Sequence, residues 1–396
     1  MCNPPTDVDE LFDCYNCTIS DILGRLAPFA YIKPHGRTVS PWYDRGCYVM
    51  LCYECYVTKL KTRRLQKAYG RHPNPSVLTL WRTLQFNRQR SLYQNKFINH
   101  WSEKINSSSG NGKALWAHLN SLLTRPKITA TTHSANSIAD HFTRKIRRIR
   151  HSTSGYSTPT ISDRSADVPL ATFRPVSADE VAALINKSPA KQCPLDPLPT
   201  WLLKDICDTI SPVIAIMCNA SISHNKFPQS QKSAIVRPLL KKTTLDPFDL
   251  NSFRPISNLS FVSKLLERII DIRFTQHADQ CQYNLFSLVQ SAYRKFHSTE
   301  TALVKIHNDL ITTIDEGHVG ALALLDLSAA FDTVDHQLLL EILRHCFCVT
   351  DSALAWFASY LSDRSQVVHI NSTSSDVFYL DCGVPQGSVL GPTKYR

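Results

Sequence analysis

One short segment carries most of the information about architecture: Gly320-Ala321-Leu322-Ala323-Leu324-Leu325-Asp326-Leu327-Ser328-Ala329-Ala330-Phe331-Asp332. Its continuous apolar run predicts a β-strand that is buried on both faces and that ends at Asp326. A helix is expected to follow the strand. The residues expected on the buried stripe of that helix are Phe331, Val334, Leu338 and Ile342.

Asp326 has two interpretations on the local sequence alone. A carboxylate at the C-terminal end of a buried strand lies at the rim of a sheet, where a divalent metal ion could bind it. Asp is also a favoured N-cap residue, so Asp326 could simply cap the next helix. The segment by itself favours neither interpretation.

A second informative segment is Cys382-Gly383-Val384-Pro385-Gln386-Gly387-Ser388-Val389-Leu390-Gly391-Pro392. Its glycines and prolines exclude a regular helix or a central strand. Before it, the segments 366–370 and 377–380 flank a short polar stretch and predict a β-hairpin. A Gly-rich loop with one amide side chain could let the backbone approach a base pair closely. Taken alone, it could also be any turn.

The positive charge of the chain is unevenly placed. The net charge is +11, and residues 56–104 contain eleven Lys or Arg against one acid, Glu103. Mixed with aromatic residues, these cations suit a polyanion whose bases stack on rings. A solvated helix face without specific purpose is the alternative. The residues expected to form a basic nucleic-acid patch are Lys59, Lys61, Arg63, Arg64, Lys67, Arg88 and Arg90.

Changes in composition divide the chain into four regions, which are 1–42, 43–125, 126–170 and 171–396. The first is predicted to hold a helix at 9–26, and the second to be helical with breaks at 70–75 and 107–112. The third reads as a Ser/Thr-rich linker interrupted by a helix at 135–150. The fourth opens on the capping box Ser177-Ala178-Asp179-Glu180 and has the apolar runs and turn signals of a folded α+β domain.

Several bulk features bear on compartment and metal content. No apolar run reaches the ~18 residues of a spanning helix, and the N-terminus lacks a signal-peptide pattern, so we expect no membrane partner and an intracellular protein of the nucleus and/or cytoplasm, not a secreted one. The pairs Cys14/Cys17 and Cys52/Cys55 have the internal spacing of a zinc site. The gap between the pairs exceeds the usual ~12–20 residues, so zinc is not expected.

Taken together and in order, six blocks resemble the reverse transcriptase of non-LTR retrotransposons, the LINE elements of the jockey and chicken-repeat kind. The blocks are 193–204, 227–228 with 234–242, 253–259, 290–299, the segment around Asp326, and 383–392. Residues 1–170 resemble the region that joins the endonuclease of such elements to the polymerase, with Ser40-Pro41-Trp42-Tyr43 as the clearest mark.

The resemblance implies a fold, an activity and partners. The fold is of α+β type, with right-hand polymerase fingers and a partial palm over residues 171–396. A mostly α-helical basic region at 43–125 precedes them, and residues 1–42 are the tail of the endonuclease or linker region. The activity is RNA-directed DNA polymerisation by two Mg²⁺ ions. The partners are an RNA template, a DNA primer and deoxynucleoside triphosphates.

The resemblance also assigns roles to matching positions around the first segment. Asp326 matches the catalytic carboxylate that binds the first metal ion, and the Leu327 carbonyl is expected to help hold the same ion. Phe331 matches the bulky residue that blocks a ribose 2′-hydroxyl and so favours deoxynucleotides.

Four further assignments concern nucleotide and template. Arg294 lies in the block expected to neutralise the triphosphate, because a guanidinium fork fits phosphate oxygens. Arg254 is a weaker candidate for template or triphosphate contact. Gln386, with Pro385 and Gly387, matches the loop that rests against the nascent base pair.

The chain departs from the family pattern after this loop. Polymerases of this kind place two adjacent Asp residues on a downstream hairpin, and no Asp-Asp pair occurs in these 396 residues. We therefore expect a fragment whose two-metal site is incomplete and which lacks turnover by itself. The alternative is a non-catalytic RNA- or DNA-binding remnant that uses its basic helices.

Overall fold

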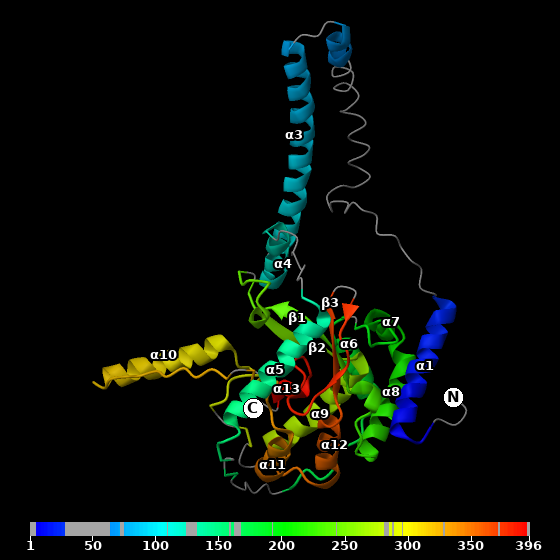
Figure 1. The fold of residues 1–396 in the computed structure, drawn as a ribbon, viewed down its shortest axis with the longest axis vertical. Coiled ribbons are helices and arrows are strands. Elements are labelled where there is room, and N and C mark those ends of the chain that lie inside the picture. Colours follow the sequence, from blue (N-terminus) through cyan, green and yellow to red (C-terminus); the bar gives the residue numbers. More distant parts are fainter. Residues whose placement is uncertain are drawn as a thin grey trace. The chain divides into compact units, whose positions relative to one another are not determined.

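The computed structural model describes most of the chain and divides it into two compact units (Figure 1). One unit comprises residues 1–29 and 131–396, and the other comprises residues 30–130. The residues described are 5–27, 64–71, 75–108, 110–123, 133–157, 160–161, 168–191, 193–242, 244–280, 285–286, 289–294, 296–327, 329–370 and 373–393. No described helix is long and apolar enough to cross a membrane.

The unit at 30–130 is helical where it is described. A helix covers residues 64–71, α3 spans Pro75–Ser107, and α4 spans Gly112–Leu123. The predicted break at 107–112 is confirmed by the turn residues 108 and 110, whereas residues 72–74 of the break predicted at 70–75 lie outside the described residues. The buried Trp101 of α3 lies edge-on to His118 of α4, with ring centroids 6.4 Å apart, so the two helices pack together.

The larger unit is built around a mixed sheet. Its strands are β1 (Ser233–Leu240), β2 (Phe253–Asn258), β3 (Ser365–Ile370), β4 (Thr373–Ser374) and β5 (Phe378–Tyr379). The strand order is β2-β1-β3-β4, and β5 also pairs with β3. β1 is antiparallel to β2 and parallel to β3. Antiparallel pairing of β3 with β4 and β5 confirms the predicted hairpin.

One face of this sheet is covered by α5 (Ala135–Thr153). Ser134 caps the helix by accepting a hydrogen bond from the Ser137 amide. The apolar residues Ala135, Ile138, Ala139 and Phe142 form one helical stripe, which packs on Val236, Phe253, Val368 and Ile370. The helix predicted at 135–150 is confirmed, and it is an integral layer of the folded unit.

The other apolar core is formed mainly by helices. These are α1 (Val8–Leu26), α6 (Ala178–Lys187), α7 (Thr200–Asp205), α8 (Cys207–Ser223), α9 (Phe261–Gln280), α11 (His336–Phe347) and α12 (Asp351–Leu361). Trp356 lies at its centre, stacked on Tyr360 and edge-on to Phe173 and Phe227. The Ser177 capping box predicted at the start of α6 is confirmed.

Helix α1 belongs to this core, and its predicted span of 9–26 is confirmed by Val8–Leu26. Val8, Leu11, Phe12 and Tyr15 are buried among the residues of that core. At its N-terminus Lys226 lies 2.7 Å from Asp9. The first residues therefore fold with the unit that contains residues 131–396, whereas the compositional division set 1–42 apart.

The prediction of a buried strand at 320–326 is wrong. Residues 318–327 are irregular, and Leu324 and Leu325 are 83% and 94% exposed. A strand needs a neighbour to satisfy its backbone hydrogen bonds, and the described strands pair elsewhere. The preceding helix α10 (Thr299–Asp315) also buries no residue. The apolar composition of residues 320–326 therefore indicated a tendency to be buried, but it did not indicate whether a neighbouring strand would be present.

The helix expected after this run is also displaced. Residues 329–333 form a turn, and α11 begins at His336, capped by Asp335. Its buried residues are Leu339 and Leu343, one position after the predicted Leu338 and Ile342. The mixed helix-and-sheet composition of the unit agrees with the predicted α+β class.

Candidate active site

The Gly-rich loop at 382–391, referred to below as the glycine loop, is bonded to the turn at 329–335. The Gly383 amide donates to the Val334 carbonyl at 2.7 Å, and the Val384 amide donates to the Phe331 carbonyl at 2.8 Å. Gly383 has a φ of +85°, and a Cβ there would overlap the Asp332 backbone. Only glycine allows this approach, so the loop and the turn form one piece of structure.

The same loop is bonded to strand β2. The Ser257 amide donates to the Gln386 carbonyl at 2.9 Å. Gly387, at φ +132°, brings its backbone so close to the Ser257 carbonyl that a Cβ would overlap it. Gly391 faces Phe331, since a Cβ on Gly391 would lie 3.6 Å from the Phe331 ring. The Phe331 side chain therefore lies against the far end of the glycine loop.

A buried carboxylate fixes this far end. Glu267 of α9 is 0% exposed, and its Oε2 accepts hydrogen bonds from the amides of Val389 at 2.6 Å and Leu390 at 3.2 Å. The sequence reasoning missed Glu267. The available signal was an acid within the densely apolar stretch of α9 that includes Leu265, Leu266, Ile269 and Ile270, because an acid at a buried position is retained only when it is paired.

Helix α5 supports the turn from the other side through an ion pair. Arg150 lies 2.8 Å from the Asp335 carboxylate, and this hydrogen bond is the main reason that the pKa of Asp335 is lowered. Burial raises the pKa of the nearby Asp332 carboxyl to about 6, and the positive charge of Lys145 opposes the rise. A second cation of α5 thus influences the turn beside Phe331.

The structure brings together four of the residues expected at the site. Phe331 meets the glycine loop that contains Pro385, Gln386 and Gly387. Pro385 is buried, Gln386 is half-buried, and Gly387 is exposed. Arg254 lies exposed on β2, the strand that binds the loop through Ser257.

The remaining expected residues lie in other segments. Asp326 and Leu327 are exposed in the irregular segment 318–327. Among the described residues, no hydrogen bond or ion pair joins Asp326 to the glycine loop. Arg294 is half-buried in the turn at 289–294. The roles assigned to these residues stay predictions.

The basic patch is only partly within the described residues. Lys59, Lys61 and Arg63 lie outside them. Arg64 and Lys67 are exposed on the helix at 64–71, and the backbones of Arg88 and Arg90 belong to α3. A role in nucleic-acid binding stays a prediction.

Metal ligation was tested on the described residues. None of them form a group of three or more His, Cys, Asp or Glu side chains that could hold a metal ion. Asp326 offers an exposed carboxylate of the hard-oxygen kind that Mg²⁺ prefers. Cys14 and Cys17 lie on α1, whereas Cys52 and Cys55 lie outside the described residues, so the expectation about zinc stays a prediction.

Comparison with known proteins gives a family match for part of the chain. Residues 239–396 match the family model of reverse transcriptase (RNA-dependent DNA polymerase). Over 221 residues, or 56% of the chain, the sequence is 31% identical to the RNA-directed DNA polymerase from mobile element jockey of Drosophila melanogaster, and this covers 24% of that protein. It is 24% identical to the probable RNA-directed DNA polymerase from transposon BS of the same organism, over 88% of this chain and 40% of the relative.

The chain thus spans well under half the length of the curated relatives that it matches. The family match begins within β1 and contains both the Asp326 segment and the glycine loop. The loop-and-turn structure that holds Phe331 lies wholly inside this match. Residues 239–396 therefore form a reverse transcriptase domain, and the chain is similar to the RNA-directed DNA polymerases of jockey and related mobile elements.

Proposed function

We propose that this chain binds an RNA template, a DNA primer and deoxynucleoside triphosphates as the fingers and part of the palm of an RNA-directed DNA polymerase that acts inside the cell. One observation carries the proposal: hydrogen bonds join the turn at 329–335, the glycine loop and β2, so that Phe331 and Gln386 belong to one rigid assembly. Rigid positioning of side chains around a nascent base pair is what template-directed selection of a nucleotide requires.

Within this proposal, each matched residue has a physical task. The Phe331 ring excludes a ribose 2′-hydroxyl, and the glycine loop packs against the nascent base pair. Arg254, exposed on β2, and Arg294 supply guanidinium groups to template or triphosphate oxygens. Asp326 provides a carboxylate, and Leu327 a carbonyl, to Mg²⁺.

Reverse transcriptases generally use Mg²⁺, which when bound stabilises the charge on the transferred phosphoryl group. The described residues bring no second and third acidic side chain beside Asp326. We therefore propose that the two-metal site is incomplete in a polypeptide of these 396 residues, and that such a polypeptide selects nucleotides without incorporating them.

The first test measures nucleotide selection in the absence of chemistry. A labelled RNA template is annealed to a DNA primer that lacks a 3′-hydroxyl, and the dissociation rate of the protein complex is measured with each deoxynucleoside triphosphate in Mg²⁺. The nucleotide complementary to the template should slow dissociation severalfold more than the others. Equal effects of all four nucleotides would refute the proposed function.

Three variants and an extension assay sharpen this test. In Phe331→Ala, deoxy- and ribonucleotides should slow dissociation of the complex by more similar factors. The complementary nucleotide should still slow dissociation more than the other three. With an ordinary primer, we expect no extension. The metal site would be complete after all if the primer were extended, and if extension were lost in Asp326→Ala but retained in Asp309→Ala. Asp309 lies on the exposed helix α10.

Binding of nucleic acid without nucleotide selection is the second candidate function. Its specific support is the density of cations between residues 56 and 104, of which Arg64 and Lys67 are exposed on one helix. Salt-sensitive RNA binding without discrimination among the four nucleotides would favour it.

A further inference from the structure

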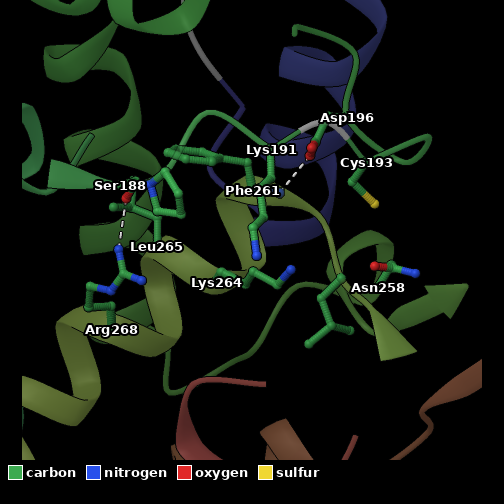
Figure 2. A pocket seen from close by; sticks show the side chains of 11 residues that line it. Ser188, Lys191, Cys193, Asp196, Asn258, Phe261, Lys264, Leu265 and Arg268 are labelled. Carbon is green, nitrogen blue, oxygen red and sulfur yellow. Dashed lines mark hydrogen bonds between the residues drawn. The ribbon is translucent and has the colours of Figure 1, made fainter. Parts of the chain in front are cut away.

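A basic cavity lies between the loop at 188–196 and the first turns of α9 (Figure 2). Its volume is about 350 Å³. The polar side chains that line it and bear on its chemistry are those of Lys191, Cys193, Asp196, Asn258, Lys264 and Arg268. None of these residues has a role in the proposed nucleotide site.

The walls of this cavity are fixed by hydrogen bonds between separate elements. Asp196 accepts a hydrogen bond from the Phe261 amide, which ties the loop to the start of α9. Arg268 donates to the Ser188 hydroxyl at 2.7 Å, which ties α9 to the end of α6. The Asn258 side-chain amide donates to the Ile235 carbonyl of β1. These hydrogen bonds join the loop, α6, α9 and β1 around the cavity.

The charge inside the cavity is positive. Figure 2 shows the amino groups of Lys191 and Lys264 pointing towards its middle. No hydrogen-bond or ion-pair acceptor for either amino group is found among the described residues. Asp196 is the one acidic residue among the described residues of the lining, and its Oδ1 is already bonded to the Phe261 amide.

We propose that this cavity binds a phosphate group of a single-stranded RNA. Two amino groups that converge on one open volume, whose lining also includes Arg268, are complementary to phosphate oxygens. Apolar side chains, those of Leu259, Phe261 and Leu265, complete the lining and offer contact surface to the attached sugar. This inference rests on the proposed function, because that function supplies the RNA.

The position of the cavity favours a strand over a free nucleotide. Asn258 lines the cavity, and its neighbour Ser257 binds the glycine loop. On α9, Lys264 and Arg268 line the cavity, whereas Glu267 between them holds the loop amides. The cavity is therefore next to the nucleotide site but separate from it. A strand that runs past the loop can reach the cavity with a phosphate several nucleotides away from the reacting end.

A site-resolved measurement is needed because the basic region at 56–104 is also expected to bind RNA. The full chain is treated with a lysine-acylating reagent, and the modification rate of each lysine is measured by mass spectrometry. Single-stranded RNA should slow acylation of Lys191 and Lys264 at least fivefold. Lys187 and Lys305, which are exposed on α6 and α10, serve as internal controls and should react at unchanged rates.

Free ligands identify the source of the phosphate. Inorganic phosphate should protect the same two lysines only at concentrations far above that of the RNA. Protection by a deoxynucleoside triphosphate at micromolar concentration, without protection by RNA, would overturn the proposal, and so would equal protection of all four lysines. An acidic peptide that protects as well as RNA would also contradict it.

A paired variant gives an independent readout. Lys191→Ala/Lys264→Ala should weaken RNA binding at least fivefold and make its salt dependence shallower by about one unit in the logarithmic slope. Lys187→Ala/Lys305→Ala removes the same charge and should leave both quantities unchanged. Identical effects of the two double variants would refute the cavity proposal. They would not bear on the proposed function, which is tested separately by the measurement of nucleotide selection.

Discussion

Asp332 shows how burial of one carboxyl group makes stability depend on pH. Its pKa is raised from 3.8 to about 6 in the folded protein, so the folded state disfavours the charged form. The free energy of unfolding therefore loses a contribution as the pH rises from about 4 to above 6, and it regains that contribution on acidification.

Asp332→Asn removes this penalty because the amide is neutral at every pH. The variant should therefore be more stable than wild type at high pH. Its gain in the free energy of unfolding over wild type should be larger by about 2 kcal/mol at pH 7.5 than at pH 4.5. Urea denaturation at the two pH values measures the difference. Asp309→Asn, on the exposed helix α10, serves as the control. A gain that is equal at both pH values would contradict the assignment.

At the level of single residues, the sequence indicated which residues belong to the site better than it indicated what surrounds them. Phe331 and Gln386 were found because they stand in recognisable motifs, and the structure brings their segments together. Glu267 and Asp332 carry no motif of their own. Their importance comes from side chains and amides that meet them from distant segments, such as Val389 for Glu267, and pairings of that kind leave no local signature.

Among the elements, the glycine loop makes a particularly strict demand on its sequence. Gly387→Ala should lower the free energy of unfolding by about 3 kcal/mol, because its positive φ disfavours a side chain and its Cβ would overlap the Ser257 carbonyl. Gly317→Ala provides a matched control, since Gly317 also has a positive φ but has no atom within 4 Å of the added Cβ.

Chemical denaturation of the two variants separates strain from overlap. We expect Gly317→Ala to lower the free energy of unfolding by about 1 kcal/mol, which is the cost of a positive φ for a residue that has a Cβ. The difference between the two variants then measures the close approach of the loop to β2. Equal losses would mean that the loop can move away from Ser257 without cost.

Two helices with the same apolar spacing show what periodicity can and cannot establish. Buried residues recur at 8, 11, 12 and 15 in α1 and at 135, 138, 139 and 142 in α5. This spacing is typical of an amphipathic helix because it places a stripe on one face. It did not indicate that α1 packs in the helical core and α5 on the sheet, because a stripe does not specify its partner. The exposed run at 318–327 illustrates the same limit for a strand.

On the scale of the whole molecule, α1 should contribute to the stability of residues 131–396. Phe12 is 0% exposed in the helical core, so Phe12→Ala should lower the free energy of unfolding by about 3–4 kcal/mol through lost burial and a residual cavity. Hydrogen exchange at the amides of α12, which belongs to the same core, should accelerate in parallel.

Ile22→Ala is the control, because this side chain of the same helix is 38% exposed. It should change the free energy of unfolding by less than about 1 kcal/mol. If Phe12→Ala were equally mild, or if exchange in α12 did not respond, then α1 would be an appendage, as the compositional division at residue 42 had suggested.

The placement of α1 has a consequence for biosynthesis. The helix emerges from the ribosome before its packing partner α8, which is encoded some 200 positions later. At elongation rates of roughly 5–20 residues per second, its apolar stripe waits for on the order of ten seconds to a minute before it can be covered. A nascent-chain holdase that shields this stripe would therefore be most needed while the residues between α1 and α8 are translated, before the reverse transcriptase domain is complete.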